Sequence, residues 1–296
     1  MLMTLDPQQL ASIRTQATLC AERFHLPLRN KVWRGGTGEF AGSGSGSSLD
    51  FQDHRIYVPG DDPRHLNWQA YARTGQYSMK LYREEVRPVI DIICDVSPSM
   101  FVDEAKSKRT SELLLLLYLS STRAGASCRV HLCSGSTHRL LAPEALSGTH
   151  WLETAKTLQE SDPDGPLALQ NIPMRASSFR VLISDLLFPG DPGPILRLLA
   201  AGQGSPFLFV PFSESESEPS WEGNYEFVDA ERGSKHPHRI DPRIIKRYLT
   251  AYRQHFALWK EACTRQQAHF ARVSAQASLE RALLAEAVPS QSLEMS

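Results

Sequence analysis

From residue 89 onward the chain alternates between short apolar runs and longer amphipathic stretches. Three almost continuously apolar runs of strand length occupy 89–94, 179–184 and 207–212. Such runs are typical of parallel strands that are buried on both faces of a sheet. The stretch 106–122 has helical character, and its middle is apolar nearly all round, so it must be buried. The alternation predicts an α/β fold built on a doubly wound, mostly parallel sheet.

Weaker patterns complete this prediction. Residues 128–133 alternate between polar and apolar types, as in a strand. Thr149 can cap a helix that extends to about Gln159, and Asp241 with the proline after it provides the cap and first turn of a long helix. The remaining predicted elements are a helix at 194–201, an edge strand at 225–228, a strand at 270–273 and a last helix from Ser278.

Segments of different composition flank this α/β domain, which we expect to span 89–288. Residues 1–34 form an N-terminal helical segment, because their apolar positions follow helical spacing. A Gly/Ser-rich loop and a block dense in turns, aromatic residues and arginines make up 35–88, which we expect to pack on the core. The last residues, 289–296, are expected to form a flexible tail.

Composition narrows the classes of function. The net charge of −1 gives no general attraction to nucleic acid or membrane. The five cysteines contain no C-x-x-C pair, which argues against a disulfide framework or a zinc site and favours a reducing compartment. No apolar run approaches the roughly 20 residues of a membrane-spanning helix, and the first residues lack the apolar core of a signal peptide. We therefore expect a cytoplasmic protein without a membrane span.

Polar residues that follow the buried runs are the sharpest candidates for chemistry. Asp95, Ser97 and Ser99 follow the first run within five residues, and Asp185 follows the second. Ligands bind at the carboxyl ends of the strands in open α/β sheets, and these oxygen ligands suit a hard divalent cation, with Mg²⁺ expected. The alternative is that Asp95 caps the next helix and the serines bind loop backbone. From the residues alone, both the cation site and the capping role stay open.

The block before the first buried strand also allows two interpretations. Its arginines and acids can form an internal network that fixes the segment to the sheet, which we favour because the charges are nearly balanced. Alternatively, its arginine, tyrosine and tryptophan residues form a partner-binding surface. The residues of interest are Arg55, Tyr57, Asp61, Asp62, Arg64, Trp68, Arg73 and Glu85.

The sequence from Asp95 to Met100 resembles the D-x-S-x-S metal-ion-dependent adhesion site of von Willebrand A domains. The longer pattern is similar to the bacterial family catalogued as domain of unknown function 58, and the resemblance covers about 34–284. It is carried by Gly38-Glu39-Phe40, Arg55, Tyr57, Pro59-Gly60-Asp61-Asp62, Arg64, Trp68, Ala72-Arg73, Glu85, Asp95 to Met100, Ile183-Ser184-Asp185-Leu186 and Arg247-Tyr248.

The resemblance implies a von Willebrand A-like, Rossmann-like fold without assigned catalysis. It further implies a MoxR-type AAA+ ATPase as partner, in the assembly of another complex or the insertion of its cofactor. Two residues depart from the pattern. Pro166 stands where a threonine ligand is expected, unless Thr149 or Thr154 replaces it, and Asn67 stands where an aspartate commonly precedes the tryptophan. The cation site is therefore expected to be degenerate.

Three functions from different classes follow. The first is a non-catalytic protein-binding adaptor, which captures a partner carboxylate at the sheet edge with or without a bound cation. The second is a metal-dependent hydrolase or phosphotransferase that uses Asp95, and the third is nucleic-acid binding through the basic region 231–272. We expect no nucleic acid, because the preceding acidic stretch would repel it, and we expect His236 and His238 to lie in a solvated loop.

Overall fold

The computed structural model describes residues 5–28, 49–59, 62, 64, 66–84, 87–161 and 167–296, with the backbone alone at 7, 49–55 and 80–84. The chain forms two compact units. One comprises Met1–Asn30 together with Pro88–Ser296, and the other comprises Lys31–Arg87. The packing of 35–88 on the core stays a prediction.

Six strands form the central sheet of the larger unit, in the order β11-β8-β7-β4-β5-β6. The predicted α/β fold with a mostly parallel sheet is confirmed, because every neighbouring pair is parallel except β5 and β6. The strands are β4 (Val89–Asp95), β5 (Ser127–Ser134), β6 (Thr137–Leu141), β7 (Phe179–Ile183), β8 (Ser205–Phe212) and β11 (His269–Ser274).

The strand order reverses between β4 and β7. From β4 the chain moves outward through β5 to β6, and then returns to place β7 on the other side of β4. Connections that leave two adjacent strands in opposite directions leave an opening at their carboxyl ends. The fold therefore offers a binding position where β4 and β7 end.

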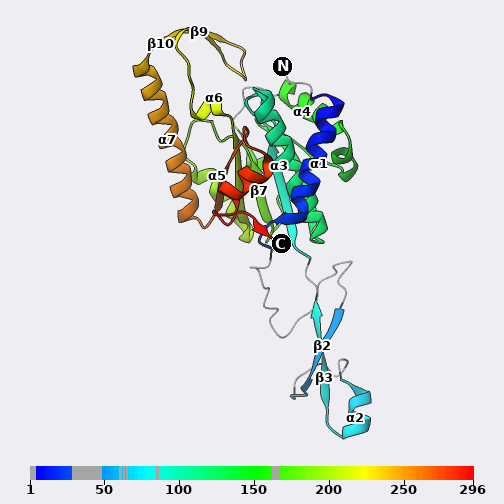
Figure 1. Cartoon of the computed structure of the whole chain (residues 1–296). Coiled ribbons are helices and arrows are strands. Elements are labelled where there is room, and N and C mark those ends of the chain that lie inside the picture. The colour runs from blue at the N-terminus through cyan, green and yellow to red at the C-terminus, as the bar shows by residue number, and fades with distance from the viewer. Residues whose placement is uncertain are drawn as a thin grey trace. The chain divides into compact units, whose positions relative to one another are not determined.

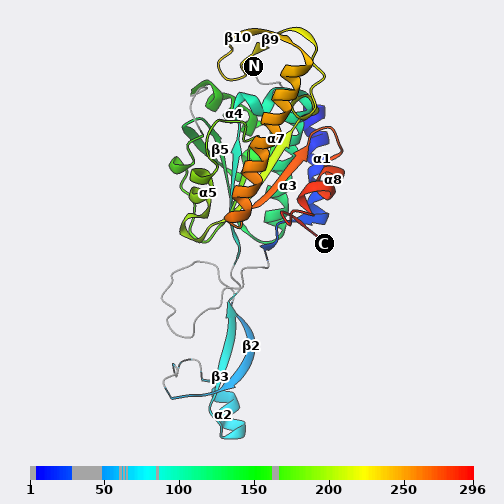
Figure 2. The same ribbon diagram turned by 90° about the vertical axis from the view of Figure 1, so that its left-hand side faces the viewer.

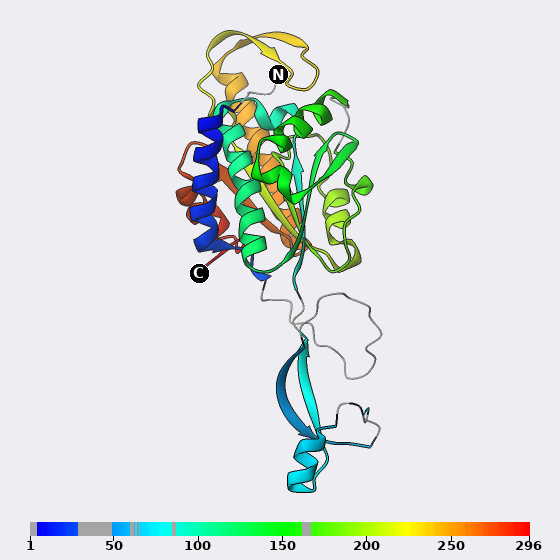
Figure 3. The ribbon, with the colours of Figure 1, turned by 90° about the vertical axis from the view of Figure 1, so that its right-hand side faces the viewer.

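Helices cover both faces of the sheet (Figure 1). Buried residues of α1 (Pro7–Arg23), α3 (Glu104–Arg123), α4 (His150–Ser161) and α8 (Leu279–Ala282) pack against one face. Those of α5 (Gly193–Ala200) and α7 (Pro242–Arg265) pack against the other. Figure 2 shows α7 lying across the near side of the sheet, and Figure 3 shows α1 and α3 in front of the opposite side.

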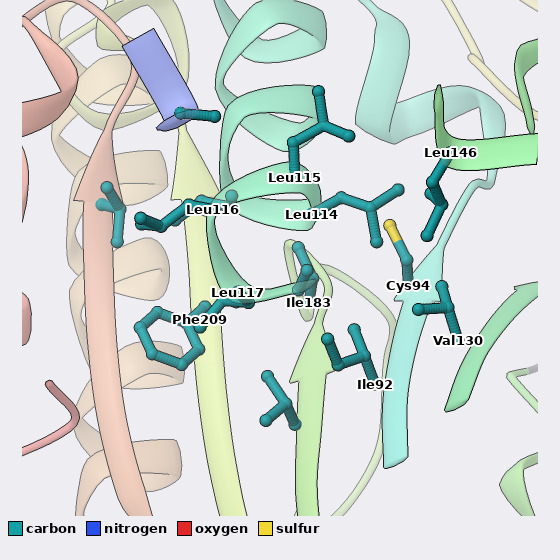
Figure 4. Packing of buried hydrophobic residues seen from close by; sticks show 14 of the residues in the cluster. Ile92, Cys94, Leu114, Leu115, Leu116, Leu117, Val130, Leu146, Ile183 and Phe209 are labelled. Carbon is teal, nitrogen blue, oxygen red and sulfur yellow. The ribbon is translucent and has the colours of Figure 1, made fainter. Parts of the chain in front are cut away.

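Alternation along β4 explains why an almost entirely apolar strand is required. Ile90, Ile92 and Cys94 face the helices of the first layer, whereas Ile93 faces those of the second. Leu114 to Leu117 of α3 pack against the side chains of Ile92, Ile183 and Phe209 (Figure 4). Burial of apolar side chains on both faces fixes the strand ends that carry the polar residues.

The predicted edge strand lies instead in a separate hairpin. β9 (Gly223–Val228) pairs with β10 (Lys235–Ile240) and does not join the main sheet. Trp221 contacts both Phe227 of this hairpin and Tyr248 of α7, with ring centroids 5.2 and 5.6 Å apart. These aromatic contacts hold the hairpin to the helix, and His236 and His238 are exposed on β10 and not in a loop.

The smaller unit contains an antiparallel ribbon and one short helix. β2 (Leu49–Ile56) pairs with β3 (Ser78–Glu84), and α2 (Trp68–Thr74) precedes β3. Asn67 caps α2 by accepting a hydrogen bond from the Ala70 N–H at 3.1 Å, and Gly75 ends it at a φ of 68°. The positive φ at the end of α2 favours glycine. In the described ranges, no helix is long and apolar enough to span a membrane.

The end of the chain differs from the expected flexible tail. β1 (Phe24–His25) pairs with β12 (Glu294–Met295), and Leu293 is only 1% exposed. Leu293 belongs to the same apolar cluster as α1 and α3. Its burial, together with the β pairing, anchors the last residues to the first helix.

We expect Leu293→Ala to lower the free energy of unfolding by about 2–5 kcal/mol, because it removes buried methyl groups and leaves a cavity. Met295→Ala is the matched control, since Met295 is 45% exposed, and should change stability by about 0.5 kcal/mol or less. Urea unfolding followed by far-UV circular dichroism measures both. Equal midpoints for the two variants would contradict the anchored terminus.

Candidate functional site

The carboxyl ends of three neighbouring strands meet at one edge of the sheet, and each is followed by an acid. β4 ends with Asp95, β7 is followed by Asp185, and β8 leads into the short helix α6 (Glu214–Ser217), which contains Glu216. Since β8, β7 and β4 are adjacent and parallel, their ends lie side by side. The sheet thus assembles three carboxylates at the switch point.

Asp95 is held by two hydrogen bonds. Its Oδ1 accepts the Ser97 N–H at 2.9 Å, and its Oδ2 accepts the Ser184 hydroxyl at 2.8 Å. The side chain is almost completely buried. Burial, and secondarily the charge of Asp185, raises the pKa of Asp95 to about 6. Folding therefore disfavours the ionised form of the Asp95 carboxyl.

The two predicted serines lie next to each other. Ser97 precedes a 3₁₀ turn, Pro98–Phe101, and its hydroxyl oxygen is 3.1 Å from that of Ser99. The side-chain amide of Gln159 in α4 donates to the Val96 carbonyl at 2.6 Å, and this contact ties the turn to α4. Asp95, Ser97 and Ser99 lie in one turn, and the contact made by Gln159 is visible only in the tertiary structure.

Asp185 makes its main contact with a lysine that the sequence analysis does not single out. Its Oδ2 accepts from the Lys106 ammonium at 2.9 Å, and its Oδ1 accepts the Leu187 N–H at 3.1 Å. Lys106 lies in the first turn of α3 and also donates to Oε1 of Glu216. Burial alone lowers the pKa of Lys106, but the charges and hydrogen bonds of both acids outweigh it and raise that pKa.

Glu216 is oriented by its own short helix. Its Oε2 accepts the Ser213 N–H at 3.0 Å in a capping box, and its backbone carbonyl accepts the Tyr248 hydroxyl of α7 at 2.8 Å. A signal for Glu216 exists in the sequence, because the third apolar run is followed directly by Ser213-Glu214-Ser215-Glu216. Lys106 gives no such signal, because nothing local distinguishes a buried lysine from a solvated one.

These residues do not fit the four-ligand divalent cation site that the sequence predicts. Such a cation takes six or more oxygen ligands, several of which are water in the case of Mg²⁺, and the two serine hydroxyls could provide two of them. Asp185, however, is turned toward an ammonium group, whose charge opposes that of a second cation. Across the described ranges, no three His, Cys, Asp or Glu side chains are arranged to hold a metal.

The threonine that could complete a cation site is also not provided by the candidates named above. Thr149 is exposed, and the Thr154 hydroxyl donates to the His150 carbonyl at 3.0 Å. Pro166 lies outside the described residues. A bound cation therefore stays a prediction from the family resemblance.

The residues of the smaller unit can be placed in part. Arg64 and Asp62 form an ion pair at 2.8 Å in which the arginine is 87% exposed, so the pair contributes little to stability. Arg73 is exposed in the last turn of α2. Asp61 and Glu85 lie outside the described residues, as does the side chain of Arg55. The predicted network is thus described only at Arg64 and Asp62.

Aromatic rings of this unit form an exposed group that we call the aromatic cluster: Tyr57, Trp68, Tyr71 and Tyr77. The rings of Tyr71 and Tyr77 stack with centroids 4.4 Å apart, and Trp68 meets Tyr71 edge-on at 6.3 Å. Tyr57 contacts Tyr77 at 6.1 Å. Trp68 is nevertheless 60% exposed and Tyr77 46% exposed. The rings thus contact one another while large parts of Trp68 and Tyr77 stay exposed to solvent.

Comparison with known protein families shows to which family the chain belongs. A family model described as "Protein of unknown function DUF58" matches residues 53–258, more than two thirds of the chain. The chain belongs to the DUF58 family. The matched region of this DUF58 protein includes the aromatic cluster, the three acids of the sheet edge and most of α7.

Other comparisons add little. No curated protein matches the DUF58 chain. Among solved structures, the crystal structure of the conserved hypothetical protein BatB from Bacteroides thetaiotaomicron is similar, at 13% identity and a TM-score of 0.38. The match covers 69% of this chain and 98% of that one. At this TM-score the likeness supports no conclusion about fold or function.

We expect Asp95→Asn to stabilise the protein at pH 7.5. A carboxyl whose pKa is raised by folding costs stability above that pKa, and the cost disappears as pH falls toward the unfolded value. With the folded pKa of Asp95 at about 6, the cost at pH 7.5 is at most about 3 kcal/mol. Asparagine keeps the acceptor for the Ser97 N–H and removes the charge.

Thermal unfolding of wild type and variant across pH 4–8 measures this effect. The stability difference should be largest above pH 7 and should vanish near pH 4. Glu144→Gln is the control, because Glu144 is exposed in a 3₁₀ turn. A variant less stable than wild type at pH 7.5 would contradict the cost of the buried charge.

Proposed function

We propose that this DUF58 protein is a non-catalytic, von Willebrand A-like adaptor that binds other proteins in the cytoplasm. The proposed partner is a MoxR-type AAA+ ATPase, with a client complex whose assembly or cofactor insertion the two proteins assist. Support for the von Willebrand A type comes from the strand order with its antiparallel edge strand β6, and from the aspartate and serine turn at the switch point.

The observation that carries the proposal is the aromatic cluster. Tryptophan and tyrosine are enriched among the residues that dominate binding energy at protein interfaces, and exposed apolar patches mark such surfaces. Ile56 and Val58 beside the cluster are 77% and 56% exposed. A two-stranded ribbon by itself is marginally stable in water, so a surface of this kind on β2, α2 and β3 favours a partner.

Catalysis by Asp95 receives less support from the geometry. A nucleophile or general base has to reach a substrate, whereas Asp95 is 4% exposed and both of its oxygens accept internal hydrogen bonds. Asp185 is engaged by Lys106 and by backbone in the same way. The hydroxyls of Ser97 and Ser99 lie 3.1 Å apart and can bond to each other.

Alanine substitution of the aromatic cluster tests the proposal. We expect Trp68→Ala to weaken binding to a MoxR-type ATPase of the same genome by about 2 kcal/mol, roughly thirtyfold in Kd. The two purified proteins can be compared by biolayer interferometry. Because no residue of α2 is buried, the thermal midpoint of the variant should stay close to that of wild type.

Leu140→Ala is the matched control, since Leu140 is a large apolar residue that is 55% exposed on β6. It should bind like wild type. Equal affinities of wild type, Trp68→Ala and Leu140→Ala would show that the aromatic cluster is not part of the interface. If wild type does not bind the ATPase, the proposed partner is wrong.

The outer face of α7 is a second binding surface to consider. This helix carries six arginine and lysine residues and a single acid, Glu261. A groove beside it is lined by 219–222 and by α7, including Lys246 and Arg253. The acidic segment that begins at α6 lies against the same helix through Trp221 and Tyr248, and its charge opposes the approach of nucleic acid.

Fluorescence anisotropy with labelled single-stranded DNA distinguishes this alternative. We expect no binding at physiological salt. Affinity that falls steeply with salt, as phosphate contacts require, and that is lost in Lys246→Glu would favour nucleic-acid binding instead.

A further inference from the structure

Lys106 is buried at a position where a positive charge is unfavourable. It occupies the third residue of α3, after the cap at Asp103, and its side chain is 0% exposed. Desolvation of an unpaired ammonium is costly, and the positive end of the helix dipole disfavours a cation in the first turn. A lysine here therefore depends on nearby acids that compensate its buried charge.

The acids at the sheet edge compensate the charge of the Lys106 ammonium. Asp185 and Glu216 both contact the ammonium, and Asp95 lies close enough to Asp185 for its pKa to be raised by that charge. Without Lys106, Asp185 and Glu216 would meet at the buried edge without a cation between them, with Asp95 next to Asp185. Carboxylates gathered in this way repel each other and attract a cation.

The ammonium also lies on the acid that a metal ion would need. It is 2.9 Å from Oδ2 of Asp185, while the other oxygen of Asp185 accepts a backbone N–H. Lys106 therefore neutralises the second aspartate of the D-x-S-x-S…D pattern and links it to Glu216 on the next strand connection.

We propose that the Lys106 ammonium is the resident cation of this sheet edge and takes the place of a divalent metal ion. The site is then complete without metal. Its consequence for partners, that binding at this edge does not depend on Mg²⁺, rests on the proposed function. The charge substitution itself concerns the isolated chain and can be tested without any partner.

The test measures Mn²⁺ binding to the purified full chain by electron paramagnetic resonance, with Mg²⁺ and EDTA added in parallel thermal unfolding. Wild type should bind no Mn²⁺ up to millimolar concentration, and neither Mg²⁺ nor EDTA should shift its thermal midpoint. Lys106→Ala should lose stability in EDTA, because Asp185 and Glu216 remain without the cation that both contact. It should also gain a Mn²⁺ site, and Mg²⁺ should restore part of its midpoint.

Lys108→Ala is the matched control, two residues further along α3. Lys108 is half exposed and lies 3.9 Å from Glu112, away from the three acids. This variant should behave like wild type toward both ions. If Lys106→Ala does not fold in EDTA, Lys106→Gln replaces it, because glutamine keeps most of the buried volume and removes the charge.

Two results would overturn the proposal. Stoichiometric Mn²⁺ binding by wild type that is lost in Asp95→Asn would show that the metal site is intact beside Lys106. Folded Lys106 variants that bind no Mn²⁺ would show that the lysine is only a structural ion pair. A failure to bind the ATPase in the Trp68 experiment would change neither the Mn²⁺ binding nor the thermal midpoints measured here. The proposed function and the proposal about Lys106 can therefore fail independently.

Discussion

The parallel pairing of β4 with β7 is the constraint on which the site depends. It places Cys94 opposite Ile183, so that the residues following each strand leave the sheet at the same edge. The Ser184 hydroxyl can then bond to Asp95 across the strands, and Asp185 comes close to both. Because α3 and α4 cover one face and α5 and α7 the other, these polar ends follow strands that are largely apolar apart from Asp91 in β4 and Arg180 in β7.

Polar residues at such an edge have to balance one another. Asp95 is satisfied by a backbone N–H and a hydroxyl, while Asp185 and Glu216 share Lys106. A charge that is buried without a partner would cost more than the pairing gains, which explains why each acid has one.

The smaller unit has the opposite character. α2 buries no residue, and the stacked rings of Tyr71 and Tyr77 lie at the surface of a two-stranded ribbon. Its order comes from backbone pairing, the Asn67 cap and contacts between aromatic rings. This chain thus combines a sheet edge whose polar groups are bonded to one another with a ribbon surface whose aromatic and aliphatic side chains are exposed.

The sequence by itself determined the α/β class and the position of Asp95, Ser97, Ser99 and Asp185, because apolar periodicity marks buried strands and strand ends mark binding edges. It also located α3 and α7 closely, through the cap at Asp241 and the apolar run in α3. Only the tertiary structure decided that Lys106 points to Asp185, that Leu293 is buried, and that 223–240 form a separate hairpin. These outcomes depend on contacts between residues 79 or more positions apart, or on which strand a short segment finds as its neighbour. No local pattern carries that information, since a lysine or a short amphipathic strand looks the same in sequence whether it is solvated or packed against a distant element.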